Sequence, residues 1–409
     1  MTDALLSDVR RLAERETPQM ISFLREMVAI PSESAEEDAV VQRICREMEA
    51  VGFDEVRVDG LGNVLGRVGS GSRVIAMDAH IDTVGVGDAS AWSFDPYQGK
   101  LEDGVIWGRG ASDQEGGMAA MVYAGKIIKE LGLDGDYQLW VVGTVMEEDC
   151  DGLCWQYILN EKILAPEVVV ITEPTDLGVY RGHRGRMEME IRVRGRSAHG
   201  AHPELGDNAV YKMGPIIAEV ERLNMRLEET ADPFLGKGSC TISDIRSTSP
   251  SLCAVADSCT IHVDRRLTDG ETEASAVAEL EALKSVREAG AEVRVLEYER
   301  AAYTGLVYPT RKYYPTWTLP EDHPAIESAV HVARSVLGRE PRVGRWGFST
   351  NGVAICGMHG IPCVGFGPAN EIHAHSVDDR CPVADLTAAA QFYALFPQRY
   401  LETAVGGTK

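Results

Sequence analysis

The chain has 409 residues, of which 44% are apolar and 25% are charged. This length suits two domains, and the composition excludes a disordered chain, a collagen-like repeat and a small disulfide-stapled scaffold. Asp and Glu outnumber Lys and Arg by 63 to 40, so the formal net charge is −23. Such a surface repels phosphate groups, and we expect neither nucleic acid nor membrane as a partner.

The N-terminal segment does not suggest export, and no stretch of the sequence suggests membrane insertion. The segment from Met1 to Met20 is charged and amphipathic, and it lacks the unbroken apolar core of a signal peptide. No stretch approaches the roughly 18 apolar residues that a membrane span needs. The nine cysteines, scattered from Cys45 to Cys381, indicate reduced thiols. We therefore expect a cytoplasmic protein.

The first part of the chain alternates helical and strand patterns. Apolar spacing and turn residues predict, in order, a helix at 40–51, strands at 55–58, 63–68 and 73–77, a helix at 116–131, and strands at 137–145 and 168–172. Strands that alternate with helices predict a largely parallel or mixed sheet that is covered on both faces.

The pattern changes after about Gly182. It predicts a half-exposed strand at 187–193, a helix at 208–226, strands at 240–245 and 253–263, a helix at 271–289 and a strand at 292–296. This β-α-β-β-α-β order is typical of a small α+β domain with an antiparallel sheet.

After Ala301 the sequence again alternates helical and strand patterns, as in the first part of the chain. It predicts a Pro-rich loop at 308–320, a helix at 324–337, a strand at 362–366 and a final helix at 383–400. We therefore expect an α/β domain, formed by residues 1–182 and 300–409, that is interrupted by an inserted α+β domain at 183–299.

Histidines and acids gather where predicted strands end. His80 and Asp82 follow the strand at 73–77, and residues two apart on a strand face the same side. Asp82 could therefore support a metal-bound His80, because such a histidine usually donates its other N–H to an acceptor. Taken alone, this pair is more often a surface turn.

A glycine-rich segment from Trp107 to Gly117 carries Asp113. A phosphate-binding loop is excluded because the G-K-[ST] arrangement is missing and the loop is acidic. Acids in a tight loop suit a cation, although Asp113 could also cap the following helix.

Three further strands end in the same way. Glu147 and Glu148 follow the strand at 137–145, Glu173 follows 168–171, and His373 and His375 follow 362–366. Sites in open α/β sheets lie at the carboxyl ends of the strands. The coincidence of five such segments favours a carboxylate-rich metal site over five independent surface loops.

The same segments occur in the same order in the M20 metallohydrolases, which include acetylornithine deacetylase, succinyl-diaminopimelate desuccinylase, aminoacylase and glutamate carboxypeptidase. The chain resembles this family along nearly its whole length, including segments 195–199 and 206–210 of the insertion. The resemblance implies a zinc-exopeptidase-like catalytic domain with a mixed sheet and an inserted ferredoxin-like α+β lid and dimerisation domain. Segments 78–87 and 348–352 look most like an M20 subgroup that is linked to selenium metabolism.

The resemblance also implies roles for single residues. His80 and Glu173 look like the terminal ligands of one divalent ion, and Glu148 and His375 look like those of a second. Asp113 looks like the carboxylate that bridges them. The expected metal is zinc, with cobalt or manganese as alternatives. His373 is the rival of His375, which we prefer because it occupies the family's A-H-x-x-[DN]-[DE] pattern.

The remaining roles concern catalysis and substrate. Glu147 resembles the general base and acid, and Asp82 resembles the acid behind His80. In the lid, His199 matches a histidine that stabilises the oxyanion, often in the other subunit, so a homodimer through the lid is implied. Asn208 resembles a residue that lines the substrate site. Arg266 matches a position where an arginine can bind a substrate carboxylate, although an exposed strand-end arginine is equally consistent.

One segment departs from the family. Where deacetylases and desuccinylases usually carry G-[GT]-[TS]-D-[AG]-R, this chain has Gly347-Phe-Ser-Thr-Asn-Gly352, so it reads the distal part of its substrate differently. We expect a hydrolase that cleaves an amide bond in a small N-acyl amino acid or dipeptide-like substrate. The alternative is a non-catalytic, metal-dependent binding protein that retains the fold.

Overall fold

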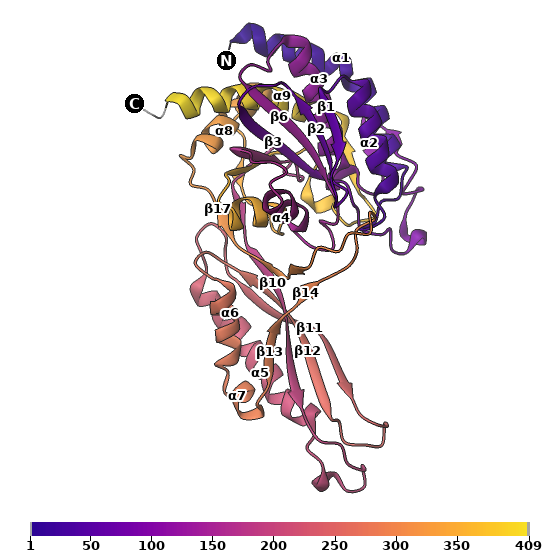
Figure 1. The fold of residues 1–409 in the computed structure, drawn as a ribbon, viewed down its shortest axis with the longest axis vertical. Coiled ribbons are helices and arrows are strands. Elements are labelled where there is room, and N and C mark those ends of the chain that lie inside the picture. Colours follow the sequence, from indigo (N-terminus) through magenta and orange to yellow (C-terminus); the bar gives the residue numbers. More distant parts are fainter. Residues whose placement is uncertain (1, 407–409) are drawn as a thin grey trace.

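The computed structural model describes residues 2–406 and shows a broad domain with a narrower one extending from it (Figure 1). Two separate apolar cores match these two parts. One core draws its buried side chains from the chain up to Tyr180 and from Ala302 onward. The other lies between Met187 and Val295. The domain boundaries at 183 and 299 remain a prediction.

The broad domain contains an eight-stranded mixed sheet in the order β1-β2-β6-β3-β7-β19-β8-β18. Its strands are β1 (Glu55–Val58), β2 (Val64–Val68), β3 (Arg73–His80), β6 (Tyr137–Thr144), β7 (Val168–Ile171), β8 (Val179–Tyr180), β18 (Val343–Gly344) and β19 (Cys363–Gly365). Strands β6, β3, β7 and β19 are mutually parallel, so their carboxyl ends share one edge of the sheet.

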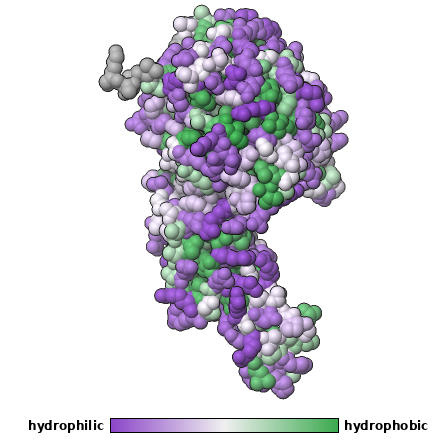
Figure 2. All heavy atoms as spheres, in the orientation of Figure 1, coloured by the Kyte–Doolittle hydropathy of each residue, from purple (hydrophilic) through white to green (hydrophobic). Residues whose placement is uncertain are grey.

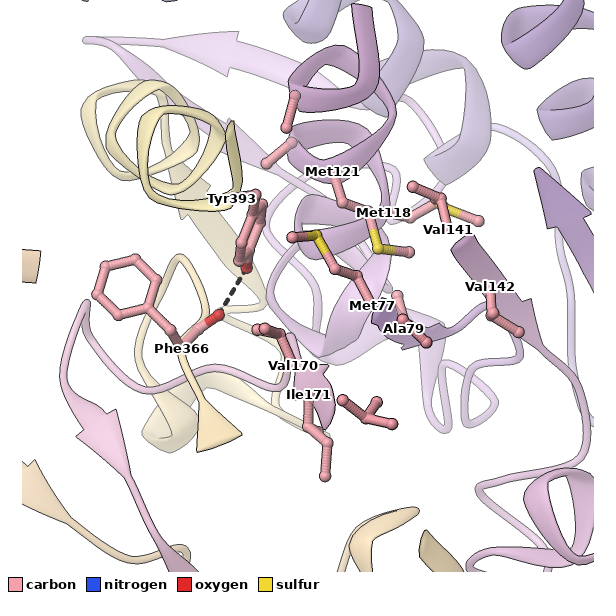
Figure 3. Close-up of a cluster of buried hydrophobic side chains, with 14 of the residues drawn as sticks. Met77, Ala79, Met118, Met121, Val141, Val142, Val170, Ile171, Phe366 and Tyr393 are labelled. Atoms are coloured by element: carbon pink, nitrogen blue, oxygen red, sulfur yellow. Dashed lines mark hydrogen bonds between the residues drawn. The ribbon is translucent and has the colours of Figure 1, made fainter. Parts of the chain in front are cut away.

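Helices cover both faces of this sheet. They are α1 (Asp3–Val28), α2 (Asp38–Ala50), α3 (Gly116–Leu131), α4 (Leu153–Asn160), α8 (Pro324–Leu337) and α9 (Val383–Gly406). Met77 and Ala79 of β3 lie against Met118 and Met121 of α3 (Figure 3). Because neighbouring strand residues face opposite sides, Asp78 points the other way, where it accepts a hydrogen bond from Trp155 of α4.

The narrower domain, which we call the lid, has the predicted ferredoxin-like topology. Its elements are β10 (Gly185–Arg194), α5 (Ala209–Arg226), β11 (Ser239–Thr248), β12 (Ser258–Leu267), α6 (Glu273–Glu281), α7 (Lys284–Ala289) and β13 (Glu292–Val295). The strand order is β11-β12-β10-β13, with every pair antiparallel. Alternate residues of β10 are buried against the helices, so the opposite face of the sheet is polar.

Short strands complete the fold, and some of them join the two domains. They are β4 (Lys100–Glu102), β5 (Val105–Trp107), β9 (Gly182–His183), β14 (Glu297–Tyr298), β15 (Thr310–Arg311), β16 (Tyr313–Tyr314), β17 (Trp317–Thr318) and β20 (Arg380–Pro382). Strand β16 pairs with β10 of the lid, and β17 pairs with β9. The Pro-rich segment at 308–320 is therefore not a simple loop.

Two other predicted elements differ in the structure. The helix expected at 271–289 is two helices, because Leu283 has an extended ψ of 133° and Glu219 accepts a hydrogen bond from the Ser285 backbone N–H at 2.7 Å. The strand expected from Cys253 begins at Ser258, because residues 249–257 form the turn between β11 and β12.

All nine cysteines lie within the described residues and are free thiols, as the sequence predicts. Among residues 2–406, no helix combines the length and the apolar character needed to cross a membrane. A cytoplasmic location remains a prediction.

Candidate metal centre and active site

The parallel strands bring the predicted ligands to one edge of the sheet. His80 is the last residue of β3, Glu147 and Glu148 follow β6, and Glu173 follows β7. Because β3 pairs with both β6 and β7, these side chains converge although up to 93 residues separate them in sequence.

The first group of donors surrounds His80. Its Nε2 lies 3.0 Å from Asp113 Oδ1 and 3.5 Å from Glu173 Oε1. Its Nδ1–H donates to the Asp82 backbone carbonyl at 2.8 Å, which turns Nε2, the ring atom that would bind a metal, toward these carboxylates. His80, Asp113 and Glu173 are all buried.

The second group surrounds His375. Its Nε2 lies 3.0 Å from Glu148 Oε2 and 3.3 Å from Asp113 Oδ2. Asp113 therefore has one oxygen toward each histidine, which is the arrangement expected of a bridging carboxylate. Hydrogen bonds from both histidines, together with their charge, hold the pKa of Asp113 below its usual range although burial opposes this.

Buried oxygen atoms test whether these residues suit a cation. Glu147 Oε1 and Glu173 Oε2 are buried and have no hydrogen-bond donor among the described residues. Burial raises the pKa of both carboxyls well above the usual range. A divalent cation would satisfy the Glu173 oxygen, and the His and carboxylate donors are those that zinc binds.

The loop that carries Asp113 is fixed by Asp379, which lies four residues after His375. Asp379 accepts hydrogen bonds from the Gly110 backbone N–H at 2.8 Å and from the Ser112 N–H and Oγ–H at 2.9 and 2.7 Å. Arg109 Nη1 donates to the same carboxylate at 3.1 Å. Burial nevertheless raises the pKa of Asp379 to about 6. The two segments that contribute Asp113 and His375 are thus held together.

Asp82 acts differently from the sequence-based expectation. Its carboxylate Oδ1 is 3.7 Å from His80 Nδ1, and its backbone carbonyl makes the closer contact. The carboxylate instead accepts the backbone N–H groups of Glu147 and Glu148 at 3.1 and 3.0 Å, and the Ser34 hydroxyl at 2.7 Å. Asp82 therefore positions both the His80 ring and the two adjacent glutamates.

The five predicted metal ligands share one cavity of about 370 Å³ with Glu147 and Arg266. Its lining residues are His80, Asp113, Glu147, Glu148, Asp151, Glu173, Arg186, Arg266, Phe348, Ser349, Glu371, Ala374 and His375. Four of these lining residues were not predicted from the sequence: Asp151, Arg186, Ser349 and Glu371. Asp151 stands in the same acidic run as Glu147, but a run of acids does not reveal which of its members face inward.

Two predicted residues lie elsewhere in the same chain. His199 is exposed, and its Nδ1 accepts the Ala201 backbone N–H at 3.1 Å. Asn208 caps helix α5, where its Oδ1 accepts the N–H groups of Val210 and Tyr211. Neither residue lines the cavity of its own chain. His373 does not line the cavity either, whereas His375 does.

The departing segment, residues 347–352, forms part of the cavity wall and of the core behind it. Asn351 is buried, and its Nδ2 donates to Asp78 Oδ2 at 3.0 Å and to Thr144 Oγ1 at 3.1 Å. Its Oδ1 accepts the Gly152 backbone N–H at 3.1 Å. Asn351 thus ties β3 and β6 to the start of α4.

His183 holds the neighbouring Thr350. Its Nδ1–H donates to the Arg184 carbonyl at 2.8 Å, and its Nε2 accepts from Trp317 Nε1 at 2.7 Å and from the Thr350 backbone N–H at 3.1 Å. Burial lowers the pKa of His183 to about 4, so the ring is neutral in this network.

A family model described as peptidase family M20/M25/M40 matches residues 76–399. The chain belongs to this family. It is 56% identical over 384 residues to YgeY of Escherichia coli K12, described as uncharacterized, with 94% of this chain and 95% of that relative covered. It is 27% identical over 395 residues to the succinyl-diaminopimelate desuccinylase of Magnetococcus marinus, with 93% and 97% covered.

The solved structure of Bacillus subtilis YXEP, described as a dinuclear metal binding peptidase of the M20 family, shares the fold. The TM-score is 0.71 at 14% identity, and 95% of this chain and 99% of that chain are covered. These comparisons confirm the predicted family and fold, and the protein is an M20-type metallohydrolase. The similarity to a selenium-linked subgroup remains a prediction.

Proposed function

We propose that the protein hydrolyses an amide bond in a small N-acyl amino acid or dipeptide, with two divalent metal ions as cofactors and zinc as the expected metal. The position of Asp113 carries this proposal, because its two oxygens face His80 and His375, 3.0 and 3.3 Å away. Each histidine has a further acid beside it, Glu173 or Glu148. Cobalt or manganese could use the same nitrogen and oxygen donors.

Glu147 is the proposed general base and acid. When bound, two divalent cations would lower the pKa of a water molecule and polarise the amide carbonyl. Glu147 takes the proton of the attacking water and passes it to the departing nitrogen. Its buried Oε1 has no donor among the described residues, so that oxygen is available for the proton. Asp82 holds Glu147 at this point through the Glu147 backbone N–H.

The cavity supports a small substrate with a carboxylate. Its volume of about 370 Å³ suits a molecule of dipeptide size. Arg266 lines it and pairs with Asp264 through Nε at 2.8 Å and Nη2 at 3.3 Å. We assign Arg266 to the substrate carboxylate because a guanidinium has further N–H donors in its planar fork.

We further propose a homodimer in which His199 and Asn208 complete the cavity of the partner subunit. His199 lies on the same tip of the lid as the exposed Leu252, and the tip carries apolar surface at the lower end of the molecule (Figure 2). Exposed apolar side chains are typical of contact surfaces. Mixing a His199→Ala variant with a Glu147→Gln variant should restore activity if subunits exchange.

Activity of the zinc-loaded protein on a panel of N-acyl amino acids and dipeptides tests the proposed reaction. We expect metal-dependent turnover in the wild type, and Glu147→Gln should lose turnover while it retains metal. Loss of both would make Glu147 a ligand rather than the base. A wild type that binds metal but hydrolyses nothing on the panel would favour a non-catalytic binding protein.

A further inference from the structure

Asp151 is a buried acid on the cavity wall that the proposed reaction does not use. It is 7% exposed, yet it lines the cavity together with the metal-site residues. Its Oδ1 accepts Arg186 Nη2 at 2.8 Å, and its Oδ2 accepts the Ser349 hydroxyl. These two bonds hold the carboxylate in one orientation. Since a carboxylate has about four acceptor sites, Asp151 retains sites for a ligand.

The Ser349 hydroxyl oxygen beside Asp151 also accepts hydrogen bonds. Ser349 gives its single proton to Asp151, so its oxygen has only acceptor sites left. Arg186 uses one nitrogen on Asp151, and its Nη1 is 3.6 Å from Glu188 Oε1. Arg186 is thus paired with Asp151, and its Nε–H is a buried donor that has no partner among the described residues. A substrate group that meets Asp151 and the Ser349 oxygen must donate hydrogen bonds.

A second acid lines the same cavity at the other end of segment 347–349. The Gly347 backbone N–H approaches the Glu371 carboxylate, whose Oε2 is buried with no partner among the described residues. The positive charges of Arg342 and Arg345 attract the Glu371 carboxylate, but both side chains donate hydrogen bonds to backbone carbonyls elsewhere. Phe348, between the two ends, adds an aromatic ring to the lining.

The acids of the cavity lining favour a donor group that is cationic. Two divalent ions would balance the four carboxylates of the metal site, Asp113, Glu147, Glu148 and Glu173. The other two acids of the lining are Asp151, which is paired with Arg186, and Glu371, which forms no ion pair among the described residues. An ammonium group has three donors and a full charge, and it also binds well against an aromatic ring.

We propose that Asp151 is a specificity-determining residue which, with Ser349 and Glu371, receives an ammonium group of the substrate. The preferred substrates are then small amides with a free amine, such as unblocked dipeptides, rather than amides whose every nitrogen is acylated. This inference rests on the proposed amide hydrolase function, because it assigns the substrate class of the same cavity.

Binding to an arrested enzyme tests the inference separately from turnover. The probes are L-alanyl-L-alanine and L-lactyl-L-alanine, which differ only by an ammonium group in place of a hydroxyl. Calorimetry on zinc-loaded Glu147→Gln protein should show about tenfold or tighter binding of the ammonium probe, the range of one charge-assisted hydrogen bond. Adding Asp151→Asn should abolish this preference, and adding Glu371→Gln should reduce it.

Asp149→Asn in the same background is the matched control. Asp149 stands two residues away and makes the same type of contacts, to Tyr298 at 2.7 Å and Arg300 at 2.9 Å, but it does not line the cavity. It should leave the preference intact. Equal affinities, a preference for the hydroxyl probe, absence of binding, or a preference that survives Asp151→Asn would each overturn the inference. Failure of the proposed function is seen instead in the wild type, as absence of metal-dependent hydrolysis.

Discussion

The network around Asp379 makes a prediction whose size follows from the structure. Asp379→Asn removes one charge and replaces one acceptor oxygen by an NH2 group, among donors from Gly110, Ser112 and Arg109. Arg109 is only 4% exposed, so its cation would be left without its partner. Breaking a buried ion pair on one side costs about 3–5 kcal/mol.

We therefore expect Asp379→Asn to lower the free energy of unfolding of the apoprotein by about 3 kcal/mol. The measurement is urea denaturation at pH 8, where a carboxyl with a pKa of about 6 is ionised. Because Asp379 holds the loop of Asp113, zinc affinity should also fall, by about 10- to 100-fold.

Asp378→Asn is the matched control, since Asp378 is exposed and adjacent. It should change neither the stability nor the zinc affinity. Equal urea midpoints and equal zinc affinities of the two variants would refute a role of the buried network in supporting the metal loop.

Three further predictions concern single residues. His183 has a pKa of about 4 in the folded chain against about 6.5 unfolded, so the unfolded state binds more protons as the pH falls and stability is lost. Between pH 7 and pH 5 the free energy of unfolding should fall by about 2 kcal/mol for this reason. In urea denaturation the free energy of unfolding of His183→Gln should depend less on pH than that of the wild type, and parallel pH profiles of the two proteins would contradict this. Asn351→Ala should lower the free energy of unfolding by about 2–4 kcal/mol because it leaves buried polar groups unpaired, whereas the exposed Asn160→Ala should cost under about 1 kcal/mol in the same denaturation assay. His375→Ala should lose one of two zinc ions by elemental analysis while His373→Ala keeps both, and the opposite result would exchange their roles.

Much of the metal site could be predicted because it follows from local signals. Glu147 and Glu173 stand directly after apolar runs of strand length, and parallel strands bring their carboxyl ends to one edge. The boundaries of helix 116–131 were likewise predictable, since Gly132 with a φ of 62° ends it as a C-cap. In these places local propensity and tertiary packing agree.

Contacts between distant segments were beyond such signals. Asp379 and Gly110 are 269 residues apart, and no local pattern pairs them. Whether Asp151 faces the cavity depends on Ser349, 198 residues later. The break between α6 and α7 depends on Glu219 of another helix. The expectation that Asp82 faces the same side as His80 holds only within a strand. Strand β3 ends at His80, so the Asp82 side chain makes other contacts.

Zinc content of the Asp113→Ala variant tests the central claim most directly, because Asp113 faces both histidines. After zinc loading and removal of excess metal, elemental analysis should find two ions per chain in the wild type. We predict that Asp113→Ala retains close to none, whereas loss of a terminal ligand such as His375 removes one. Two ions retained by Asp113→Ala, or none bound by the wild type, would contradict a dinuclear centre bridged by this carboxylate.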